Sequence, residues 1–447
     1  MAKYQKYAEY KDSGVEWLGE IPNDWEMWKL SHAYTEIGSG TTPSTSNEEN
    51  FEGNIPWVTT GELRENLILD TKKKVSQRTI EQFPTLKKYP IGSVAIAMYG
   101  ATIGRLGIFG IEATTNQACC VMTTSKVLNN KYVFYWLQAF KNEIIQLSSG
   151  GGQPNINQEK VASLKISAPF FEDQINIANF LDHETAKIDS LIAKQEKLIE
   201  LLKEKRQAVI SHAVTKGLNP DAAMKDSGVE WLGQVPEHWN VIKFNHCVQI
   251  RNGLVDPRHE NYKNLILYAP NHIDKGTGKI LYKETAEEQG ADSNKYLCFK
   301  GEVIYSKIRP ALAKVAICEE DSALCSADMY PMDGFNGLSN KFLYYFILSD
   351  SFTEAVILDS DRVAMPKINR ESLSEYKLPI PPLEEQKRII DFIETIGWNL
   401  DKLEQQAQKA IQLMQERRIA LISSAVTGKI DVRNWQHPNE AKMEFSA

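Results

Sequence analysis

The sequence predicts an α+β protein made of two similar halves, each with one globular domain followed by one long helix. Three observations predict this architecture. A heptad pattern without proline or glycine covers residues 171–216, a second copy lies 212 residues later, and the segment 11–25 returns 214 residues later. We expect the two helices to pair as an antiparallel coiled coil within the chain, with an internal pseudo-twofold repeat.

The helix expected over 171–216 has one narrow apolar stripe. Its seven-residue positions are Leu181, Ile188, Gln195, Leu202 and Val209, with Leu191 and Leu198 between them. This spacing forms the seam of a coiled coil. A stripe of this width is not buried by one helix alone, so the sequence predicts a partner helix.

The second heptad stretch supplies that partner. Its seam positions are Ile393, Leu400, Ala407, Met414 and Leu421, with Leu403 and Ala410 between them. A lone stretch of this kind is typical of a homodimerising coiled coil. Two copies separated by a domain-sized segment favour pairing within one chain.

A repeated segment opens each half. Residues 11–25 and 225–239 are identical at eleven of fifteen positions, which indicates duplication. In each copy Asp-Ser-Gly turns the chain, and a Trp-Leu pair provides an apolar anchor. The predicted division is a first domain over 1–168, a central helix over 169–218, a second domain over 219–380, a C-terminal helix over 381–432 and a tail over 433–447.

The two globular domains are similar in plan and different in sequence. In the first, short apolar runs bounded by glycine or proline predict strands within 55–60, 93–99 and 107–109, and a helix is expected over 130–147. In the second, the run 301–309 and a helix near 341–349 are the counterparts. A repeated frame with diverged surfaces suits a bipartite, asymmetric target such as duplex DNA, because side chains read DNA locally at base edges.

Composition is that of an ordinary globular protein. The 447 residues are 42% hydrophobic and 24% charged, with a net charge of −7. No apolar run is long enough to predict a membrane span, so we expect a cytoplasmic protein. Six cysteines without a C-x-x-C pair predict reduced thiols, and eight histidines without ligand spacing predict no metal site.

Catalytic motifs are not found in the sequence. An adenine methyltransferase needs a glycine-rich cofactor loop and an Asn/Asp-Pro-Pro-aromatic tetrad, and the nearest string is Asn54-Ile55-Pro56-Trp57. No G-x-x-x-x-G-K-[ST] loop occurs to cradle a phosphate. We therefore predict no catalytic residue, although an enzyme with an unrecognised site stays open at this point.

Several motifs together carry a resemblance to a known family. They are the repeated segments at 12–25 and 226–239, the Thr-Thr-Pro-Ser loop at 41–44, the Ile-Pro-Trp-Val run at 55–58, the segments 100–105 and 115–118, and the proline-containing segments 168–175 and 379–386 that precede the helices. The layout resembles the specificity subunit of type I restriction-modification enzymes over nearly the whole chain. The second half has Arg251-Asn252-Gly253 where the Thr-Pro-Ser loop is expected.

The resemblance implies a non-catalytic, DNA-binding subunit of a phage-defence system. Two target recognition domains would each read one half of a split DNA site, and the helices would dock two methyltransferase subunits that methylate adenine with S-adenosylmethionine. Restriction subunits that use ATP and Mg²⁺ would join the assembly, so no cofactor is expected in this chain. The alternative is a coiled-coil adaptor with two ligand-binding domains that do not contact DNA.

Candidate DNA contacts follow from side-chain chemistry, because Arg pairs with guanine and Asn or Gln with adenine. In the first domain they are Thr41, Thr42, Ser44, Thr45, Lys72, Lys73, Lys74, Tyr99, Thr102, Arg105, Gln153 and Asn155. In the second domain they are Arg251, Asn252, Tyr305, Lys307, Arg309, Arg362 and Lys367. Lys72–Lys74 are interpreted as a basic loop, with a solvated turn as the alternative.

Overall fold

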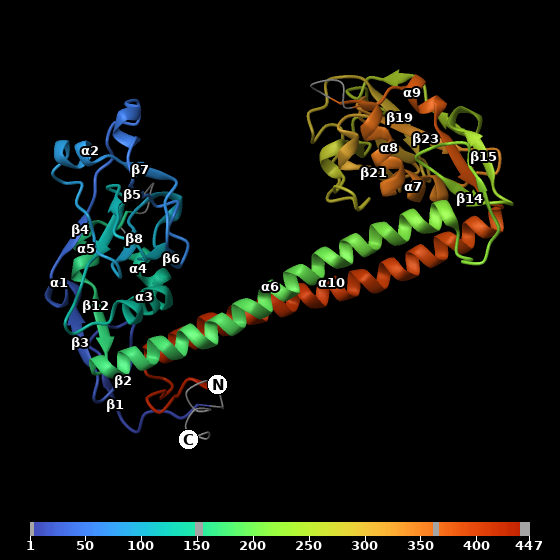
Figure 1. Cartoon of the computed structure of the whole chain (residues 1–447). Coiled ribbons are helices and arrows are strands. Elements are labelled where there is room, and N and C mark those ends of the chain that lie inside the picture. Colours follow the sequence, from blue (N-terminus) through green and yellow to red (C-terminus); the bar gives the residue numbers. More distant parts are fainter. Residues whose placement is uncertain (1–3, 148–154, 361–365, 439–447) are drawn as a thin grey trace. The chain divides into compact units, whose positions relative to one another are not determined.

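The computed structural model describes residues 4–147, 155–360 and 366–438 (Figure 1). Contacts along the backbone divide the chain into two compact units. Unit 1 contains Met1–Lys194 and Lys409–Ala447, and unit 2 contains Gln195–Gln408. Both long helices cross from one unit to the other, so each unit combines one globular domain with a part of each helix.

The two predicted long helices are present. Helix α6 spans Phe171–Lys216, and helix α10 spans Leu383–Val426 within the expected 381–432. Each ends one or two residues before a glycine in the left-handed region, Gly217 at φ +76° and Gly428 at φ +69°. A residue with a Cβ atom rarely adopts this conformation, so glycine ends a helix at low cost. At Gly428 a Cβ would also lie 2.2 Å from the Cγ of Pro22.

Ion pairs between the two helices have an antiparallel register within each unit. In unit 2, Arg206 pairs with Asp401 at 2.7 Å, and Lys203 pairs with Glu404 at 3.7 Å. A step of three residues back along α6 therefore matches a step of three residues forward along α10. In unit 1, Arg418 binds Asp189 through two nitrogens, at 2.8 and 3.3 Å. This pair has the same register.

The structure contradicts three of the fourteen predicted seam positions, and the others are buried or half-buried. The main positions Leu181, Ile188, Leu400, Ala407 and Leu421 are buried. The intervening leucines, Leu191, Leu198 and Leu403, are exposed instead. Their neighbours Ile192 and Ile199 turn toward the partner helix and are half-buried. The prediction of Leu191, Leu198 and Leu403 as seam residues is wrong. At Leu191 and Leu198 the adjacent isoleucine also fits the heptad, and packing against the partner helix selects between the two residues.

The globular domain of unit 1 is built around a five-stranded sheet. Its order is β4-β11-β8-β9-β6, with β6 parallel to β9 and the other neighbours antiparallel. A second sheet, β10-β5-β7, and the pairs β1-β2 and β12-β3 complete the strands. The elements are β1 (Tyr10–Asp12), β2 (Glu20–Pro22), β3 (Glu26–Lys29), α1 (Leu30–Ala33), β4 (Ile37–Ser39), β5 (Ile55–Val58), β6 (Asn66–Ile68), β7 (Lys73–Val75), α2 (Gln77–Gln82), β8 (Val94–Ala97), β9 (Leu106–Phe109), β10 (Thr114–Thr115), β11 (Cys119–Met122), α3 (Asn130–Ala139), α4 (Lys141–Gln146), α5 (Gln158–Ser163) and β12 (Lys165–Ala168).

The domain of unit 2 has the same plan. Its sheet β16-β23-β20-β21 matches the order β4-β11-β8-β9, and its second sheet is β17-β19-β22-β18. The elements are β13 (Met224–Asp226), β14 (Gln234–Pro236), β15 (Asn240–Lys243), β16 (Val248–Ile250), β17 (Leu254–Val255), β18 (Leu267–Tyr268), β19 (Lys295–Phe299), β20 (Val303–Ser306), β21 (Val315–Ile317), β22 (Ser322–Cys325), β23 (Met329–Gly334), α7 (Asn340–Leu348), α8 (Asp350–Ser360), α9 (Arg370–Glu375) and β24 (Lys377–Ile380). The strands predicted from the short apolar runs are therefore confirmed in both halves.

The single helix expected over 130–147 is divided into α3 and α4. The break is at Phe140, whose backbone leaves helical geometry at φ −109° and ψ 23°. Its ring lies 4.5 Å from that of Trp136 and 5.0 Å from that of Trp17. The break turns Phe140 into the core beside the tryptophan of the repeated segment, a contact that helix periodicity alone does not predict.

A buried glutamine anchors each domain to its own long helix. Gln174 of α6 accepts a hydrogen bond from the backbone N–H of Asn129 at 2.7 Å and donates to the carbonyls of Val127 and Pro169. In unit 2, Gln386 of α10 accepts from the N–H of Ser339 at 2.9 Å and donates to two carbonyls in the same way. Both side chains are buried. Since Asn129 and Ser339 cap α3 and α7, each glutamine fixes the start of a domain helix.

Among the residues that the structure describes, every helix is too short or too polar to span a lipid bilayer.

Candidate nucleic-acid interface

The same loop occupies the same place in both domains. In unit 1 it joins β8 to β9 through the short 3₁₀ helix η2 (Gly100–Thr102), and in unit 2 it joins β20 to β21 through η5 (Pro310–Leu312). The segment before α5 binds the first loop, where the Ile156 N–H donates to the Met98 carbonyl at 2.8 Å. The segment before α9 binds the second, where Ile368 donates to Lys307 at 2.9 Å. The duplicated frame therefore presents two equivalent loop pairs.

Four predicted contacts of unit 1 meet at its loop pair. Tyr99 and Asn155 face each other in an isolated β-bridge, and the carbonyl of Thr102 accepts from the N–H of Arg105 at 3.0 Å. Asn155 is exposed, while the other three side chains are half-buried. Gln153 lies outside the described residues. The structure thus gathers a phenol, a hydroxyl, a guanidinium and an amide at one edge of the domain.

The Thr-Pro-Ser loop joins this group through a glutamine that the candidate set lacks. The hydroxyl of Thr42 donates to Gln117, and Gln117 also hydrogen-bonds the hydroxyl of Tyr99. Burial and the neighbouring Cys119 raise the pKa of Tyr99, so its hydroxyl stays protonated and can donate. Gln117 lies in the 115–118 segment that carries the family resemblance, which was the sequence signal for it.

The backbone of the Thr-Pro-Ser loop is held firmly. The N–H of Thr41 donates to the Thr115 carbonyl at 3.0 Å, and the indole of Trp57 donates to the Thr41 carbonyl at 3.1 Å. At Gly40 a Cβ would lie 1.8 Å from the Thr115 oxygen, so only glycine permits this approach. Ser44 and Thr45 are exposed beyond the pinned part.

The three lysines of residues 72–74 do not form a basic loop. Lys73 and Lys74 belong to strand β7, whose side chains alternate between its two faces. Lys74 pairs with Asp70 at 3.0 Å, and the Lys73 ammonium lies 4.9 Å from the centre of the Phe51 ring. Lys72 lies outside the strand, and both Lys72 and Lys73 are exposed. The loop interpretation is wrong because this segment forms strand β7, which pairs with β5. Three consecutive lysines give no local sign of this pairing.

Unit 2 has a cationic pocket at its loop pair. Its volume is about 850 Å³. It contains the predicted residues Lys307, Arg309 and Lys367 together with Lys314 and Asp328, which the sequence prediction missed. The lining residues are Pro270, Asn271, Ser306, Lys307, Ile308, Arg309, Leu312, Lys314, Asp328, Pro366 and Lys367. Four cations against one carboxylate favour a polyanion such as the DNA backbone.

Arg309 contributes an exposed side chain to this pocket. Its backbone is left-handed at φ 48°, and its N–H donates to the Pro366 carbonyl at 2.8 Å. A non-glycine residue with this φ costs conformational energy, and such residues cluster at binding sites. The side chain makes no ion pair with the described residues. Its guanidinium therefore remains available for a ligand.

Arg251 and Asn252 both bind other side chains of unit 2. The Arg251 guanidinium pairs at 2.5 Å with Glu302, which is 4% exposed, and stacks 4.5 Å from the centre of the Phe299 ring. This hydrogen bond to Glu302 raises the pKa of Arg251. The amide oxygen of Asn252 accepts from Arg370. The structure therefore gives Arg251 a structural role, and its contact with DNA stays a prediction.

Removing Arg251 tests that structural role. An Arg251→Ala variant leaves the buried Glu302 carboxylate without its partner, and we expect a loss of about 2 kcal/mol of unfolding free energy. Equilibrium denaturation of the full chain measures this loss. A variant of unchanged stability whose DNA affinity falls would contradict the structural role and restore Arg251 as a contact.

Tyr305 is also excluded from direct contact. It is 2% exposed, and its ring packs 6.1 Å from that of Phe352. Burial raises its pKa well above the ordinary range. The prediction is wrong because β20 is buried on both faces, so a polar residue within this strand does not lie at the surface. Arg362 lies outside the described residues.

Arg370 is a further residue that sequence reasoning missed. It donates to the carbonyls of Ile250 and Arg251 and lies 5.2 Å from the centre of the Tyr330 ring. Lys307 lies 5.5 Å from the centre of the same ring. In unit 1 the equivalent Gln158 binds β4 through the Ile37 carbonyl at 3.0 Å. Both residues directly follow an asparagine that caps a helix. This shared position in the two halves was the sequence signal that could have identified Arg370.

Within the described residues, no group of three or more His, Cys, Asp or Glu side chains is arranged to hold a metal ion.

Comparison with known proteins assigns the family. The sequence pattern of the type I restriction modification DNA specificity domain matches residues 22–201 and, a second time, residues 236–413. The chain belongs to this family. Its two matches fall on the two halves identified from the internal repeat.

Full-length relatives of this specificity family agree with that assignment. The chain is 27% identical over 440 residues to the type I restriction enzyme EcoDI specificity subunit of Escherichia coli, covering 94% of this chain and 92% of that protein. It is 25% identical over 429 residues to the MjaVIII specificity subunit of Methanocaldococcus jannaschii, covering 93% and 95%. The family resemblance inferred from the motifs is confirmed.

Two solved structures share the fold. The HsdS subunit of Thermoanaerobacter tengcongensis is 13% identical, with a TM-score of 0.53 over 92% of this chain and 98% of that one. A chain from a structure on complex assembly and conformational transition of the type I R-M system is also 13% identical, with a TM-score of 0.70 over 92% and 99%. At these identities the likeness supports the mixed helix and sheet architecture.

Proposed function

We propose that this specificity subunit reads a bipartite, asymmetric DNA site, one half with each globular domain. The observation that carries this proposal is the duplicated loop pair with different side chains. Unit 1 offers Tyr99, Thr102, Arg105 and Asn155, and unit 2 offers Lys307, Arg309 and Lys367 at the equivalent place. Two domains with the same backbone plan and different hydrogen-bond donors suit two half-sites of different sequence.

The long helices supply a spacer and a docking surface in this proposal. The common antiparallel register in both units supports one intramolecular coiled coil along α6 and α10 with a pseudo-twofold repeat. The exposed apolar side chains on these helices include Leu191, Leu198, Trp398, Leu403 and Ile419. Exposed apolar side chains at several positions of a helix pair favour a protein interface. They are the proposed contacts for two methyltransferase subunits.

In this proposal the partner subunits carry out the catalysed reactions. The methyltransferase subunits bind S-adenosylmethionine and methylate adenine, and restriction subunits use ATP and Mg²⁺. This chain contributes the choice of sequence and is itself non-catalytic. Its DNA contacts are the donors of the two loop pairs named above, together with the Thr-Pro-Ser loop.

A methylation map tests the function directly. The chain is expressed with its methyltransferase partner in a host that lacks both, and adenine methylation is sequenced at base resolution. We expect a split, asymmetric motif that disappears when this chain is omitted. If both proteins are soluble and associated but no motif appears, the chain is an adaptor that does not select DNA.

The spacing between the half-sites should follow the length of the helix pair. One heptad inserted after Gln195 and one after Ile411 keeps the pairs Asp189–Arg418 and Arg206–Asp401 in register. Seven residues add about 10 Å of helix, close to three base pairs. We expect a methylated motif with unchanged half-sites and a gap about three base pairs longer. A motif with its original gap contradicts the coiled-coil spacer.

A further inference from the structure

A hairpin of unit 2 reaches from the globular domain to the long helices. It covers residues 273–280 and closes through a β-bridge between Ile273 and Ile280. The Asp274 N–H donates to the Lys279 carbonyl at 2.9 Å, and the Thr277 hydroxyl donates to the Asp274 carboxylate at 2.7 Å. These internal bonds make the hairpin stiff at its tip.

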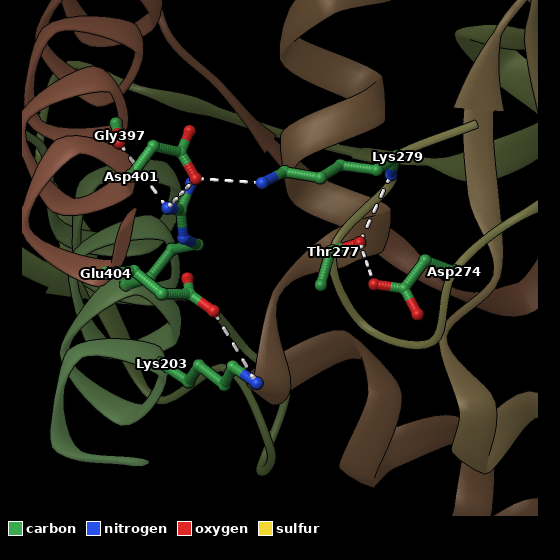
Figure 2. Close-up of polar contacts among 8 residues, drawn as sticks. Lys203, Asp274, Thr277, Lys279, Gly397, Asp401 and Glu404 are labelled. Atoms are coloured by element: carbon green, nitrogen blue, oxygen red, sulfur yellow. Dashed lines mark hydrogen bonds and ion pairs between the residues drawn. The ribbon is translucent and has the colours of Figure 1, made fainter. Parts of the chain in front are cut away.

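Asp401 of α10 joins the hairpin to both helices. Its Oδ1 atom accepts from Arg206 of α6 at 2.7 Å and from Lys279 of the hairpin at 2.8 Å, as Figure 2 shows. The next residue of α6, Gln207, donates to the Gly276 carbonyl at 2.5 Å. Three elements that are distant in sequence thus meet at one carboxylate.

The tip of the hairpin also holds the loop that carries Arg309. The Gly276 N–H donates to the carbonyl of Leu312, the last residue of η5, at 3.1 Å. The residues on either side of η5, Arg309 and Ala313, are both left-handed, at φ 48° and 42°. Strained non-glycine residues persist only where the surroundings hold them. The hairpin is one of these supports, and the Pro366 carbonyl bound by Arg309 is another.

Unit 1 shows what is particular to this arrangement. Both units pair a domain helix with a long helix, through Lys131–Asp182 at 2.6 Å and Lys341–Glu394 at 2.8 Å. For the part of unit 1 that the structure describes, no loop from the second sheet makes an ion pair with α6 or α10. The hairpin contact is therefore an additional link in unit 2.

We propose that the hairpin 273–280 is a positioning strut that sets the place of Arg309 relative to the helix pair, and that Asp401 and Lys279 determine specificity at the second half-site without touching DNA. This inference rests on the proposed function. The path is continuous, from the Asp401 carboxylate through Lys279 to the hairpin, and from Gly276 through Leu312 to the Arg309 loop.

The test compares Asp401→Ala and Lys279→Ala in the full chain assembled with its methyltransferase partner. Lys279→Ala leaves the Arg206–Asp401 pair intact, so it removes the link between the hairpin and α10 without disturbing the helices, while the Gln207–Gly276 hydrogen bond to α6 remains. Binding is measured by competition between duplexes in which one half-site is kept and the other is scrambled. We expect each variant to lower the preference for the correct second half-site about tenfold, within the range for one lost base contact. Preference for the first half-site stays unchanged.

A matched control and a coupling experiment make the result specific. Asp189→Ala breaks the Arg418 pair of the same register in unit 1, and we expect less than a twofold change at either half-site. In an Arg309→Ala background, Asp401→Ala should add less than twofold, because the strut acts through that arginine. A strut variant that discriminates like wild type overturns the proposal, as does a loss that persists undiminished without Arg309. A wild-type assembly with no sequence preference overturns the proposed function instead.

Discussion

Replacing Gln386 with leucine is expected to lower the stability of unit 2 by about 3–5 kcal/mol. The buried amide accepts from the Ser339 N–H and donates to the Gly337 and Pro381 carbonyls. Leucine has similar volume but no polar atom, so all three backbone groups lose their partner in a place without water. Hydrogen exchange should show opening of α7 with little change in α3. Gln174→Leu should produce the reverse pattern, with α3 affected.

Gln195→Leu is the matched control on the same kind of helix. Gln195 occupies a half-buried seam position, and its side chain makes no hydrogen bond with the described residues. A leucine there adds apolar contact, so we expect stability to stay constant or to rise by less than about 1 kcal/mol. If Gln386→Leu is as mild as Gln195→Leu, the glutamine does not anchor the domain.

An Arg309→Ala variant is expected to lose recognition of one half-site only. The guanidinium is exposed in the cationic pocket and has no ion pair within the described chain, so its removal leaves no buried group unpaired. A bidentate arginine–guanine contact is worth about 1–3 kcal/mol, which corresponds to a roughly five- to hundredfold loss of preference. Competition binding with half-scrambled duplexes measures it, and the methylation map should show one degenerate base in one half of the motif.

Two comparisons distinguish base recognition by Arg309 from nonspecific electrostatic attraction to DNA. Arg258 is exposed in the same unit and pairs with Asp256 at 2.8 Å outside the pocket, so Arg258→Ala should change neither half-site. Arg105→Ala should affect the other half-site. An equal loss at both half-sites after Arg309→Ala would indicate nonspecific charge attraction and would remove Arg309 from the base-reading set.

Much of the architecture was determined by the sequence itself. The duplicated segments 11–25 and 225–239 and the two heptad stretches predicted two domains and two long helices, and α6 has the bounds expected from its uninterrupted pattern. Helix periodicity and the glycines that end each helix are local properties, so they can be recognised in the amino-acid sequence alone. The family followed from motifs of the same local kind.

Only the tertiary structure decided which side chains are free to act. Arg251 and Arg309 are both arginines in loops. Arg251 forms an ion pair with the buried Glu302, whereas Arg309 is exposed on a turn with a left-handed backbone. Leu191 and Ile192 both fit the heptad, and the partner helix buries the second. Gln117, Arg370 and Asp401 gain their roles from residues tens or hundreds of positions away. Their roles depend on distances across the fold, because a hydrogen bond or ion pair requires two groups whose meeting is set by packing rather than by sequence neighbours.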